Sequence, residues 1–372
     1  MNENFCHHPW VGLEINPQGE FRPCCKYIPS LADNLLDYQN SADLVILKDA
    51  FLSGEKPQGC KYCWDDEAAG VPSKRQLDNQ YLFNQSPNYD SLKVLSFSFG
   101  NSCNLACRTC DSSSSSTWII EEKTLKNNFP GIKIHQHRRF YQDPKFIDQI
   151  KSISTDLLHV EFPGGEPFLA GITEHLDFLD FLLTTNPQDI SLHYMTNATI
   201  FPQDYFWDRW AKFKKVDIQL SIDGVGPHFE YIRWPGKWSE VENNLKLYAD
   251  KKDKCGNLKL SISHTVSIFN VYYLPEFVKW CLQNKFDMPY LGLVADPKMY
   301  NIRNLPVKVK DAISKKISRF KLENIVSYMY DEDLSAESNW SMTAVLDQQR
   351  KQSFKETFSE FYQLLKEAEC QI

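Results

Sequence analysis

The sequence has no apolar run that reaches the roughly 18 residues a membrane span needs. Its first residues, MNENFC, contain neither a basic segment nor an apolar one, so we expect no secretory signal and a cytoplasmic location. Positive charge is not in excess either, and the net charge of −7 at pH 7 argues against nucleic acid as the main partner. Hydrophobic residues still make up 42% of the 372 residues, which excludes a largely disordered chain.

Cysteine, by contrast, is abundant, with 11 residues. A chain without a signal segment is expected in a reducing compartment, where disulfides are a poor explanation for so many thiols. Three of the cysteines stand alone in the sequence and are expected to be buried or uncommitted thiols, namely Cys255, Cys281 and Cys370. The other eight form a close triplet and a more widely spaced set within the first 63 residues.

From about residue 91, short apolar strands alternate with helical stretches, which predicts βα units and a parallel sheet. The predicted strands are residues 92–99, 158–162, 190–196, 216–222, 258–268 and 288–294. Six such units are fewer than the eight that close a full barrel. The predicted fold class is therefore α/β, with a partial (βα)6 TIM barrel.

The chain divides into three predicted parts. Residues 1–90 are rich in loops and form a small cysteine-rich module. Residues 91–300 form the barrel. Residues 301–372 form a helical C-terminal extension, because the segments 307–324 and 340–369 have a helical pattern with charged faces.

The cysteine triplet directly follows the first predicted strand of the barrel. Cys103, Cys107 and Cys110 have the spacing C-x3-C-x2-C, so three thiolates in one short loop can converge on one metal centre. A structural zinc site uses four protein ligands, yet no fourth Cys or His lies within twenty residues of the triplet. Three ligands suit a [4Fe–4S] cluster that keeps one iron free for a small molecule such as S-adenosylmethionine (SAM).

This spacing, in the loop after a strand, resembles the cluster motif of the radical SAM superfamily. Gly164, Gly165 and Glu166, at the end of the second predicted strand, are similar to the GGE motif that contacts the SAM amino group in that family. The chemistry agrees, because glycines allow a close approach of the backbone and a carboxylate can pair with an ammonium group.

Further residues that follow strands resemble positions that contact SAM in the family. Asn197, after the third strand, is similar to a polar residue near SAM, and Ser221 and Asp223 are similar to residues that face its ribose. Arg233 resembles an arginine that meets the SAM carboxylate. All of these residues are expected at the carboxyl end of the barrel, where barrel active sites form.

The N-terminal cysteines form a second candidate site. Cys6 and Cys24 flank a predicted hairpin turn with the spacing C-x12-G-x4-C, and Cys60 and Cys63 form a C-x2-C pair. Four such thiols suit zinc or an iron–sulfur cluster. The pattern resembles the auxiliary-cluster modules called SPASM and twitch, which implies an auxiliary [4Fe–4S] cluster in a module that here precedes the barrel. Cys25 has no assigned role.

The resemblance implies that the chain cleaves SAM reductively to a 5′-deoxyadenosyl radical that takes a hydrogen atom from a substrate. A one-electron donor such as flavodoxin or ferredoxin would supply electrons, and the auxiliary cluster would assist electron transfer. Glu161, Tyr194 and His264 are predicted to face inward near strand ends and are candidate catalytic residues. The substrate is a peptide or protein side chain or, alternatively, a small molecule such as a sugar or nucleotide derivative. A remaining alternative is a zinc-stabilised binding protein without activity.

Overall fold

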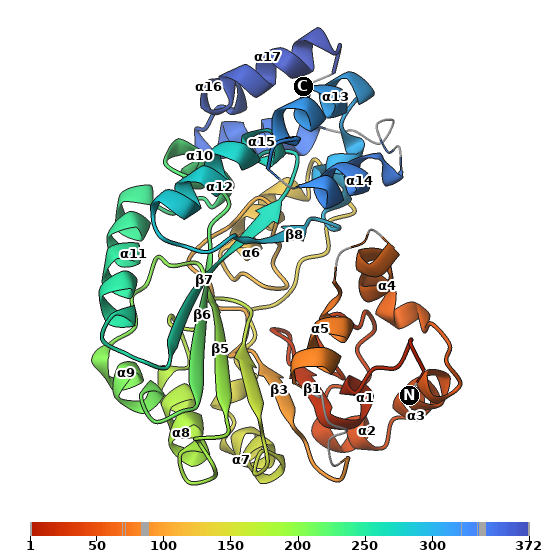
Figure 1. Ribbon diagram of the computed structural model, residues 1–372, viewed down its shortest axis with the longest axis vertical. Helices are drawn as coiled ribbons and strands as arrows, with labels where there is room; N and C mark the ends of the chain where they lie inside the picture. Colours follow the sequence, from red (N-terminus) through yellow and green to blue (C-terminus); the bar gives the residue numbers. More distant parts are fainter. Residues whose placement is uncertain are drawn as a thin grey trace.

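The computed structural model describes residues 2–68, 70, 72–82, 89–320, 322–332, 334 and 340–370. Its centre is a sheet whose eight strands lie in the order β2-β1-β3-β4-β5-β6-β7-β8 (Figure 1). The strands are β1 (Gly12–Ile15), β2 (Phe21–Arg22), β3 (Val94–Phe97), β4 (His159–Phe162), β5 (Ser191–Thr196), β6 (Lys215–Ser221), β7 (Leu258–Val266) and β8 (Tyr290–Leu293). Every neighbouring pair is parallel except β1 and β2.

The sheet is open, since β2 and β8 stand at its two ends. The six predicted barrel strands correspond in order to β3–β8, which confirms the prediction of an α/β fold with a partial barrel. Helices pack against one face of the sheet, as Figure 1 shows. They are α7 (Pro144–Ile153), α8 (Ile172–Leu182), α9 (Asp204–Trp210), α10 (Pro227–Ile232), α11 (Trp238–Lys252) and α12 (Leu274–Gln283). A further helix, α6 (Trp118–Leu125), packs instead in a small cluster with Ala106 and Leu346.

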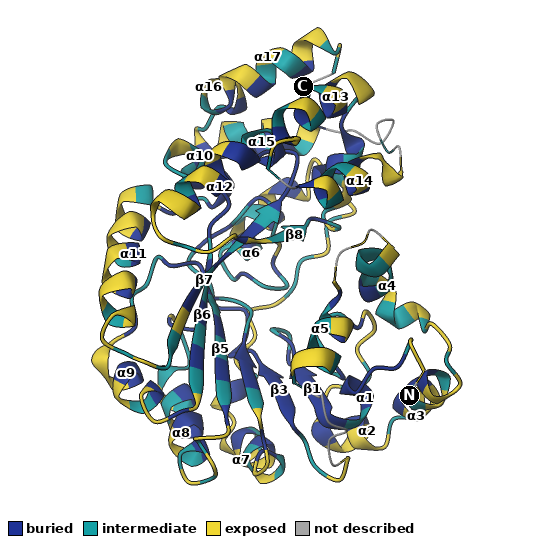
Figure 2. Cartoon of the chain, viewed as in Figure 1, coloured by how far each residue is buried: buried dark blue, intermediate teal, exposed yellow. Residues whose placement is uncertain are grey.

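The central strands are buried, most fully on the face that the helices cover (Figure 2). Burial alternates along β5, β6 and β7, because successive side chains of a strand point to opposite faces. The fully buried set packs into an aromatic and aliphatic core with α8, α9, α11 and α12. The half-buried set on the other face includes polar side chains such as His193, Asp217 and Ser261.

The N-terminal region is continuous with the barrel sheet. A hairpin joins β1 to β2 through a turn in which Gly19 has φ +82° and donates its N–H to the Asn16 carbonyl at 2.9 Å. β1 then pairs in parallel with β3, so this region extends the sheet at one edge. Its helices are α1 (His8–Val11), α2 (Leu35–Gln39), α3 (Ala42–Leu52), α4 (Lys61–Ala68) and α5 (Lys74–Tyr81).

The C-terminal helices have a core of their own that also includes the residues after β7. They are α13 (Val307–Ile317), α14 (Glu323–Asp331), α15 (Ser341–Arg350), α16 (Phe354–Thr357) and α17 (Ser359–Glu367). The stretch predicted as one helix over 307–324 contains α13 and the start of α14, and the stretch predicted over 340–369 divides into α15, α16 and α17. α15 packs against the triplet loop through an ion pair of Asp347 with Arg108 at 2.5 Å.

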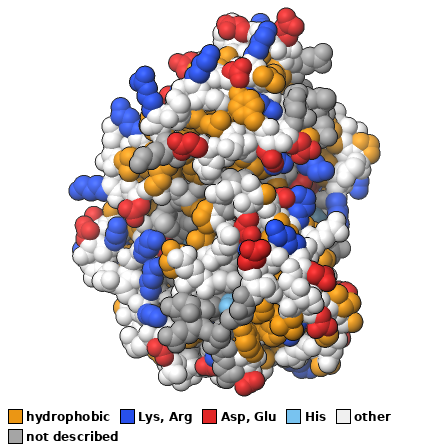
Figure 3. Space-filling view, turned by 45° about the vertical axis from the view of Figure 1, so that its right-hand side comes forward, with side chains coloured by type: hydrophobic (Ala, Val, Ile, Leu, Met, Phe, Trp, Pro, Cys, Tyr) orange, Lys and Arg blue, Asp and Glu red, His pale blue; other side chains and the backbone are white. Residues whose placement is uncertain are grey.

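Acidic and basic side chains are interspersed on the face shown in Figure 3, and apolar side chains gather at its lower right. α2 and α3 carry several exposed apolar residues, namely Leu36, Val45, Ile46 and Leu52. Within the described residues, no helix combines the length and the apolar character that crossing a membrane requires.

Candidate functional site

The triplet loop begins a few residues after β3 and is held by backbone hydrogen bonds. The Ala106 N–H donates to the Trp234 carbonyl at 2.7 Å, and the Arg108 N–H donates to the Ile232 carbonyl at 2.8 Å. The indole N–H of Trp118, at the start of α6, donates to the Cys107 carbonyl at 2.9 Å. The loop is therefore fixed by contacts with α6 and the end of α10, which positions the thiols before any cofactor binds.

The three cysteines of the triplet line one cavity of about 220 Å³. Five of the residues predicted to contact SAM line the same cavity, namely Gly164, Gly165, Asn197, Ser221 and Arg233. They come from the segments that follow β4 and β5, from the last residue of β6 and from the residue after α10, so the cavity lies at the carboxyl ends of the parallel strands. The lining also includes Leu105 and Met195, which the sequence motifs did not single out.

Gly164 and Gly165 bring the loop after β4 against the triplet loop. Both have positive φ angles, +72° and +51°, which residues with a side chain rarely adopt. A Cβ atom on Gly165 would lie 2.4 Å from the Ser102 carbonyl oxygen, and one on Gly164 would lie 2.6 Å from the Ser98 hydroxyl. Glycine is therefore required here for the close approach of the two loops.

Glu166 is buried beside this cavity but does not line it. Its carboxylate accepts hydrogen bonds from the Thr196 hydroxyl and the Asn197 N–H, both at 2.8 Å, and from the Phe168 N–H at 3.3 Å. Burial raises the pKa of Glu166 to about 7, even though these donors and Arg233 oppose the shift. The carboxylate thus holds the end of β5 in place.

Arg233 connects the cavity with Asp223. Its Nη2 lies 2.9 Å from the Asp223 carboxylate, and its Nη1 donates to the Cys107 thiol at 3.8 Å. Burial acts to lower the pKa of Arg233, but the charge of Asp223 and the neighbouring Cys107 sulfur outweigh it, so the pKa is raised. Asp223 lies behind the arginine, outside the lining of the cavity, and accepts the Thr265 N–H at 2.7 Å.

The four predicted N-terminal thiols line one small cavity. Cys6, Cys24, Cys60 and Cys63 share it with five other residues, which are His8, Lys26, Phe51, Lys74 and Arg75. Burial raises the pKa of each thiol, to about 12 for Cys60. Positive charges from Lys26 and Arg75 act in the opposite direction at Cys63 and Cys60 respectively. Cys25 does not line the cavity.

The cysteine thiols of both sites are chemically suited to bind iron–sulfur clusters, because thiolates hold such clusters and nearby N–H groups and positive charge stabilise them. The Leu105 N–H donates to the Cys103 thiol at 3.5 Å. In the described ranges no three His, Cys, Asp or Glu side chains converge closely enough to hold a single metal ion. The suitability of the two sites for iron–sulfur clusters therefore rests on the cavities that the thiols share and on the chemistry of the thiols.

The predicted inward orientation of Tyr194 and His264 is wrong. The Tyr194 hydroxyl lies 2.9 Å from His175 Nε2 and accepts the Trp210 indole N–H at 3.1 Å, so this side chain is in the core beneath α8 and α9. The His264 ring packs against that of Phe277 of α12, tilted by 37° and with ring centroids 4.2 Å apart. Both occupy the helix-covered face because they alternate along their strands with the residues of the polar face.

Glu161 lies on β4 facing the N-terminal region. Its carboxylate is 2.6 Å from Lys74 Nζ and 3.5 Å from His159 Nε2. Burial acts to raise the pKa of Glu161, but Lys74 and the two neighbouring histidines outweigh it and hold the pKa well below its usual range. A carboxylate paired in this way joins α5 to the sheet.

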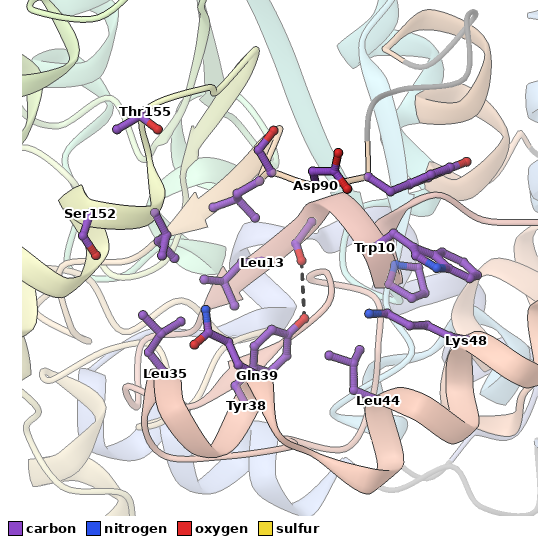
Figure 4. Close-up of a pocket in the computed structure, with 16 residues that line it drawn as sticks. Trp10, Leu13, Leu35, Tyr38, Gln39, Leu44, Lys48, Asp90, Ser152 and Thr155 are labelled. Carbon is purple, nitrogen blue, oxygen red and sulfur yellow. Dashed lines mark hydrogen bonds between the residues drawn. The ribbon is translucent and has the colours of Figure 1, made fainter.

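Another cavity, of about 410 Å³, lies near the amino-terminal ends of β1 and β3 (Figure 4). Trp10, Leu13, Tyr38 and Lys48 are among its lining residues, and the Tyr38 hydroxyl donates to the Gly12 carbonyl at 3.4 Å. Active sites of parallel barrels lie at the other ends of the strands. The position of this cavity therefore separates it from the cysteine triplet.

No protein-family model matches the chain. The Cysteine-type anaerobic sulfatase-maturating enzyme of Clostridium novyi (strain NT) is 30% identical over 95 residues, which are 23% of this chain and 24% of that protein. The chain therefore spans about a quarter of the curated relative that it matches.

Similar solved structures include native anSMEcpe with bound AdoMet and Streptococcus suis SuiB bound to S-adenosylmethionine. The first has 17% identity and a TM-score of 0.45, covering 61% of this chain and 60% of the other. The second has 15% identity and a TM-score of 0.39, covering 77% and 61%.

Proposed function

We propose that this chain is a radical SAM enzyme whose triplet, Cys103, Cys107 and Cys110, holds a SAM-binding [4Fe–4S] cluster. The observation that carries the proposal is the shared cavity, where the three thiols meet five residues that were singled out independently by the family motifs. If the thiols and the motif residues lined different cavities, a cluster and SAM could not bind side by side.

Cluster and SAM, when bound, supply a 5′-deoxyadenosyl radical that can remove a hydrogen atom from a substrate C–H bond. Arg233 offers a buried guanidinium to the SAM carboxylate, and Asp223 orients that guanidinium from behind. Glu166 lies behind the cavity wall, and its carboxylate accepts the Asn197 N–H and so positions Asn197 beside Gly164 and Gly165. Asn197 and Ser221 add polar groups along the same wall.

The N-terminal set, Cys6, Cys24, Cys60 and Cys63, is proposed to hold an auxiliary [4Fe–4S] cluster in a twitch- or SPASM-like module. Four thiols around one buried cavity support this proposal, as do the positive charges of Lys26 and Arg75 beside them. A cluster with four protein ligands has no free iron. Its proposed role is electron transfer, with flavodoxin or ferredoxin as the external donor.

The proposed substrate is a peptide or protein side chain. The curated relative is a sulfatase-maturating enzyme, and anSMEcpe and SuiB were solved with a bound peptide and with the precursor peptide SuiA respectively. The alternative substrate is a small molecule, because the polar face of β5–β7 offers hydrogen-bonding groups that would also suit a sugar or nucleotide derivative.

The test is anaerobic reconstitution of the chain with iron and sulfide, followed by iron analysis and a SAM cleavage assay. Two clusters correspond to about eight irons per chain. We expect dithionite-dependent formation of 5′-deoxyadenosine. Bound zinc without SAM cleavage would overturn the proposal. Deuterium transfer into 5′-deoxyadenosine from labelled peptides or from labelled small metabolites distinguishes the two substrate classes.

A further inference from the structure

A cavity of about 280 Å³ lies on the helix-covered side of β6 and β7, behind the proposed SAM site. Its polar end is formed by His264, Asp223 and Asn270, and the rest is mainly aromatic or apolar. The lining residues are Asp223, Gly224, Val225, His228, His264, Asn270, Tyr273, Glu276, Phe277 and Trp280. None of the three cysteines of the triplet is among them, so this is a separate space.

The protonation state of His264 follows from its surroundings. Its Nδ1 lies 2.9 Å from the Ile222 carbonyl oxygen, which can only accept, so Nδ1 carries the hydrogen. Burial lowers the pKa of His264 to about 4, and the imidazole is therefore neutral at pH 7. In a neutral imidazole with hydrogen on Nδ1, Nε2 is a hydrogen-bond acceptor.

Nε2 of His264 has no hydrogen-bond partner among the described residues, although the side chain is only 1% exposed. The neighbouring Asn270 amide already donates to the Thr265 and Asp223 carbonyls, at 2.9 and 3.2 Å. A buried acceptor without a partner is costly, so a donor that enters this cavity gains a strong hydrogen bond.

The aromatic walls define the shape of molecule that fits. The Phe277 ring lies 4.2 Å from the His264 ring and 5.8 Å from the Trp280 ring, and the His228 ring lies 4.4 Å from that of Tyr273. The Phe277 and Trp280 rings are stacked at 26°, and the other two pairs are tilted at 37° and 48°, so the walls present aromatic surface to an aromatic partner. Glu276 at the rim is paired with Lys316 at 2.9 Å, so the cavity does not call for a charged ligand.

We propose that this cavity is an effector site for a small, flat, uncharged molecule with one N–H or O–H donor, of the indole or phenol class. The donor hydrogen-bonds to His264 Nε2, and the ring packs against the aromatic walls. Nothing in this binding step requires SAM or a cluster.

The effector site reaches the proposed SAM site through a short chain of contacts. His264 holds the Ile222 carbonyl, the next residue is Asp223, and Asp223 faces Arg233. A donor on Nε2 polarises the imidazole and strengthens its Nδ1–H bond to Ile222. Occupancy therefore steadies Asp223 behind Arg233, and SAM affinity rises. This part of the inference rests on the proposed function of Arg233.

The test uses a matched pair of probes, indole and 1-methylindole, titrated calorimetrically and without oxygen into the protein as purified. Indole has the donor that 1-methylindole lacks, so we expect indole to bind about tenfold more tightly or better. Equal affinity for the two probes, or no binding of indole, would overturn the site. This readout involves no SAM, so it can fail or succeed independently of the proposed function.

Two substitutions at His264 sharpen the test. His264→Asn keeps a side-chain N–H toward Ile222 but loses the acceptor, and it should abolish the preference for indole. His264→Gln can place its amide oxygen near the position of Nε2 and should retain part of the preference. A SAM titration with saturating indole should then show tighter SAM binding in the unmodified protein and no change in His264→Asn. An unchanged SAM affinity in the protein that does bind indole would contradict the effector role.

Discussion

The two cysteine groups differ in how the chain brings their thiols together. The triplet lies within residues 103–110, in one loop after β3, and lines a cavity of about 220 Å³. The N-terminal set comes from three separated segments, around Cys6, after β2 and at the start of α4, and lies among Phe51, Lys74 and Arg75. The first group leaves room for a further molecule, whereas the second is enclosed by protein.

This difference in construction matches a difference in chemistry. A cluster with three protein ligands can bind a small molecule at its fourth iron, and one with four protein ligands can only pass electrons or stabilise the fold. The residues around the two groups differ in the same way, since glycines and an arginine from other segments border the triplet cavity. Lysines and an arginine border the N-terminal cavity.

The largest expected effect is on catalytic activity, which should distinguish the cysteine triplet from the N-terminal cysteines. Cys107→Ala removes a ligand of the proposed SAM cluster and should abolish formation of 5′-deoxyadenosine. Cys63→Ala removes a ligand of the proposed auxiliary cluster and should block product formation, yet leave SAM cleavage without turnover. Chromatography measures the amounts of 5′-deoxyadenosine and of product that each variant forms. Normal turnover by Cys63→Ala would show that the N-terminal set has no role in electron transfer.

The second prediction concerns SAM affinity at the triplet cavity. Arg233→Gln removes a buried positive charge from the proposed carboxylate site and should weaken SAM binding by roughly tenfold to a hundredfold. Equilibrium binding of SAM to the cluster-loaded protein measures this. Arg209→Gln is the matched control, because Arg209 pairs with Asp180, whose side chain is 52% exposed, and does not line the cavity. Equal SAM affinity in the two variants would remove Arg233 from the site.

The third prediction concerns the contact that joins the N-terminal region to the barrel. Lys74→Met leaves the buried Glu161 without its lysine partner and should lower the free energy of unfolding by about 3–5 kcal/mol. Urea unfolding without oxygen measures the loss.

Lys151→Met is the control for that experiment, because Lys151 pairs with Asp177, whose side chain is 57% exposed. An exposed pair contributes at most about 1 kcal/mol. Similar losses in the two variants would mean that the Lys74–Glu161 pair does not anchor the N-terminal region.

The smallest effect is a pH dependence at Glu166. Its pKa is raised to about 7 in the folded chain, above the ordinary value of 4.5, so the folded state binds more protons than the unfolded state between these values. Stability should therefore fall as pH rises from about 4.5 to 7, by about 3 kcal/mol at most. Glu166→Gln has no ionisable group and should flatten that part of the profile.

Urea unfolding at several pH values measures the Glu166 effect. Glu161 should act in the opposite direction, because its pKa is held well below the ordinary value and its contribution is lost as pH falls. The same slope in Glu166→Gln and in the unmodified protein would assign the pH dependence to other groups.

Motif spacing and strand alternation predicted a large part of this architecture. The order of β3–β8 could be read from apolar runs because each buried strand of a parallel sheet is a short apolar segment bounded by polar loops. The residues that border the triplet cavity could be found because the carboxyl ends of parallel strands meet at one edge of the sheet.

Side-chain direction was harder to predict. Tyr194 and His264 are polar residues near strand ends, as Glu161 is, yet they point to the opposite face of the sheet. A shift of one residue along a strand reverses the face, and a polar side chain can be buried under helices when a partner satisfies it. Tyr194 has His175 and Trp210 as such partners, which no local pattern reveals.

The sequence by itself determined the two thiol groups, the order of the βα units and the glycines after β4, because these depend on spacing and on local backbone geometry. Tertiary structure decided the rest. It placed β1 beside β3, brought Lys74 to Glu161, and set Asp223 between Arg233 and the cavity that contains His264. These contacts join residues far apart in the chain, and their stability comes from pairing and burial, which exist only once the sheet has formed.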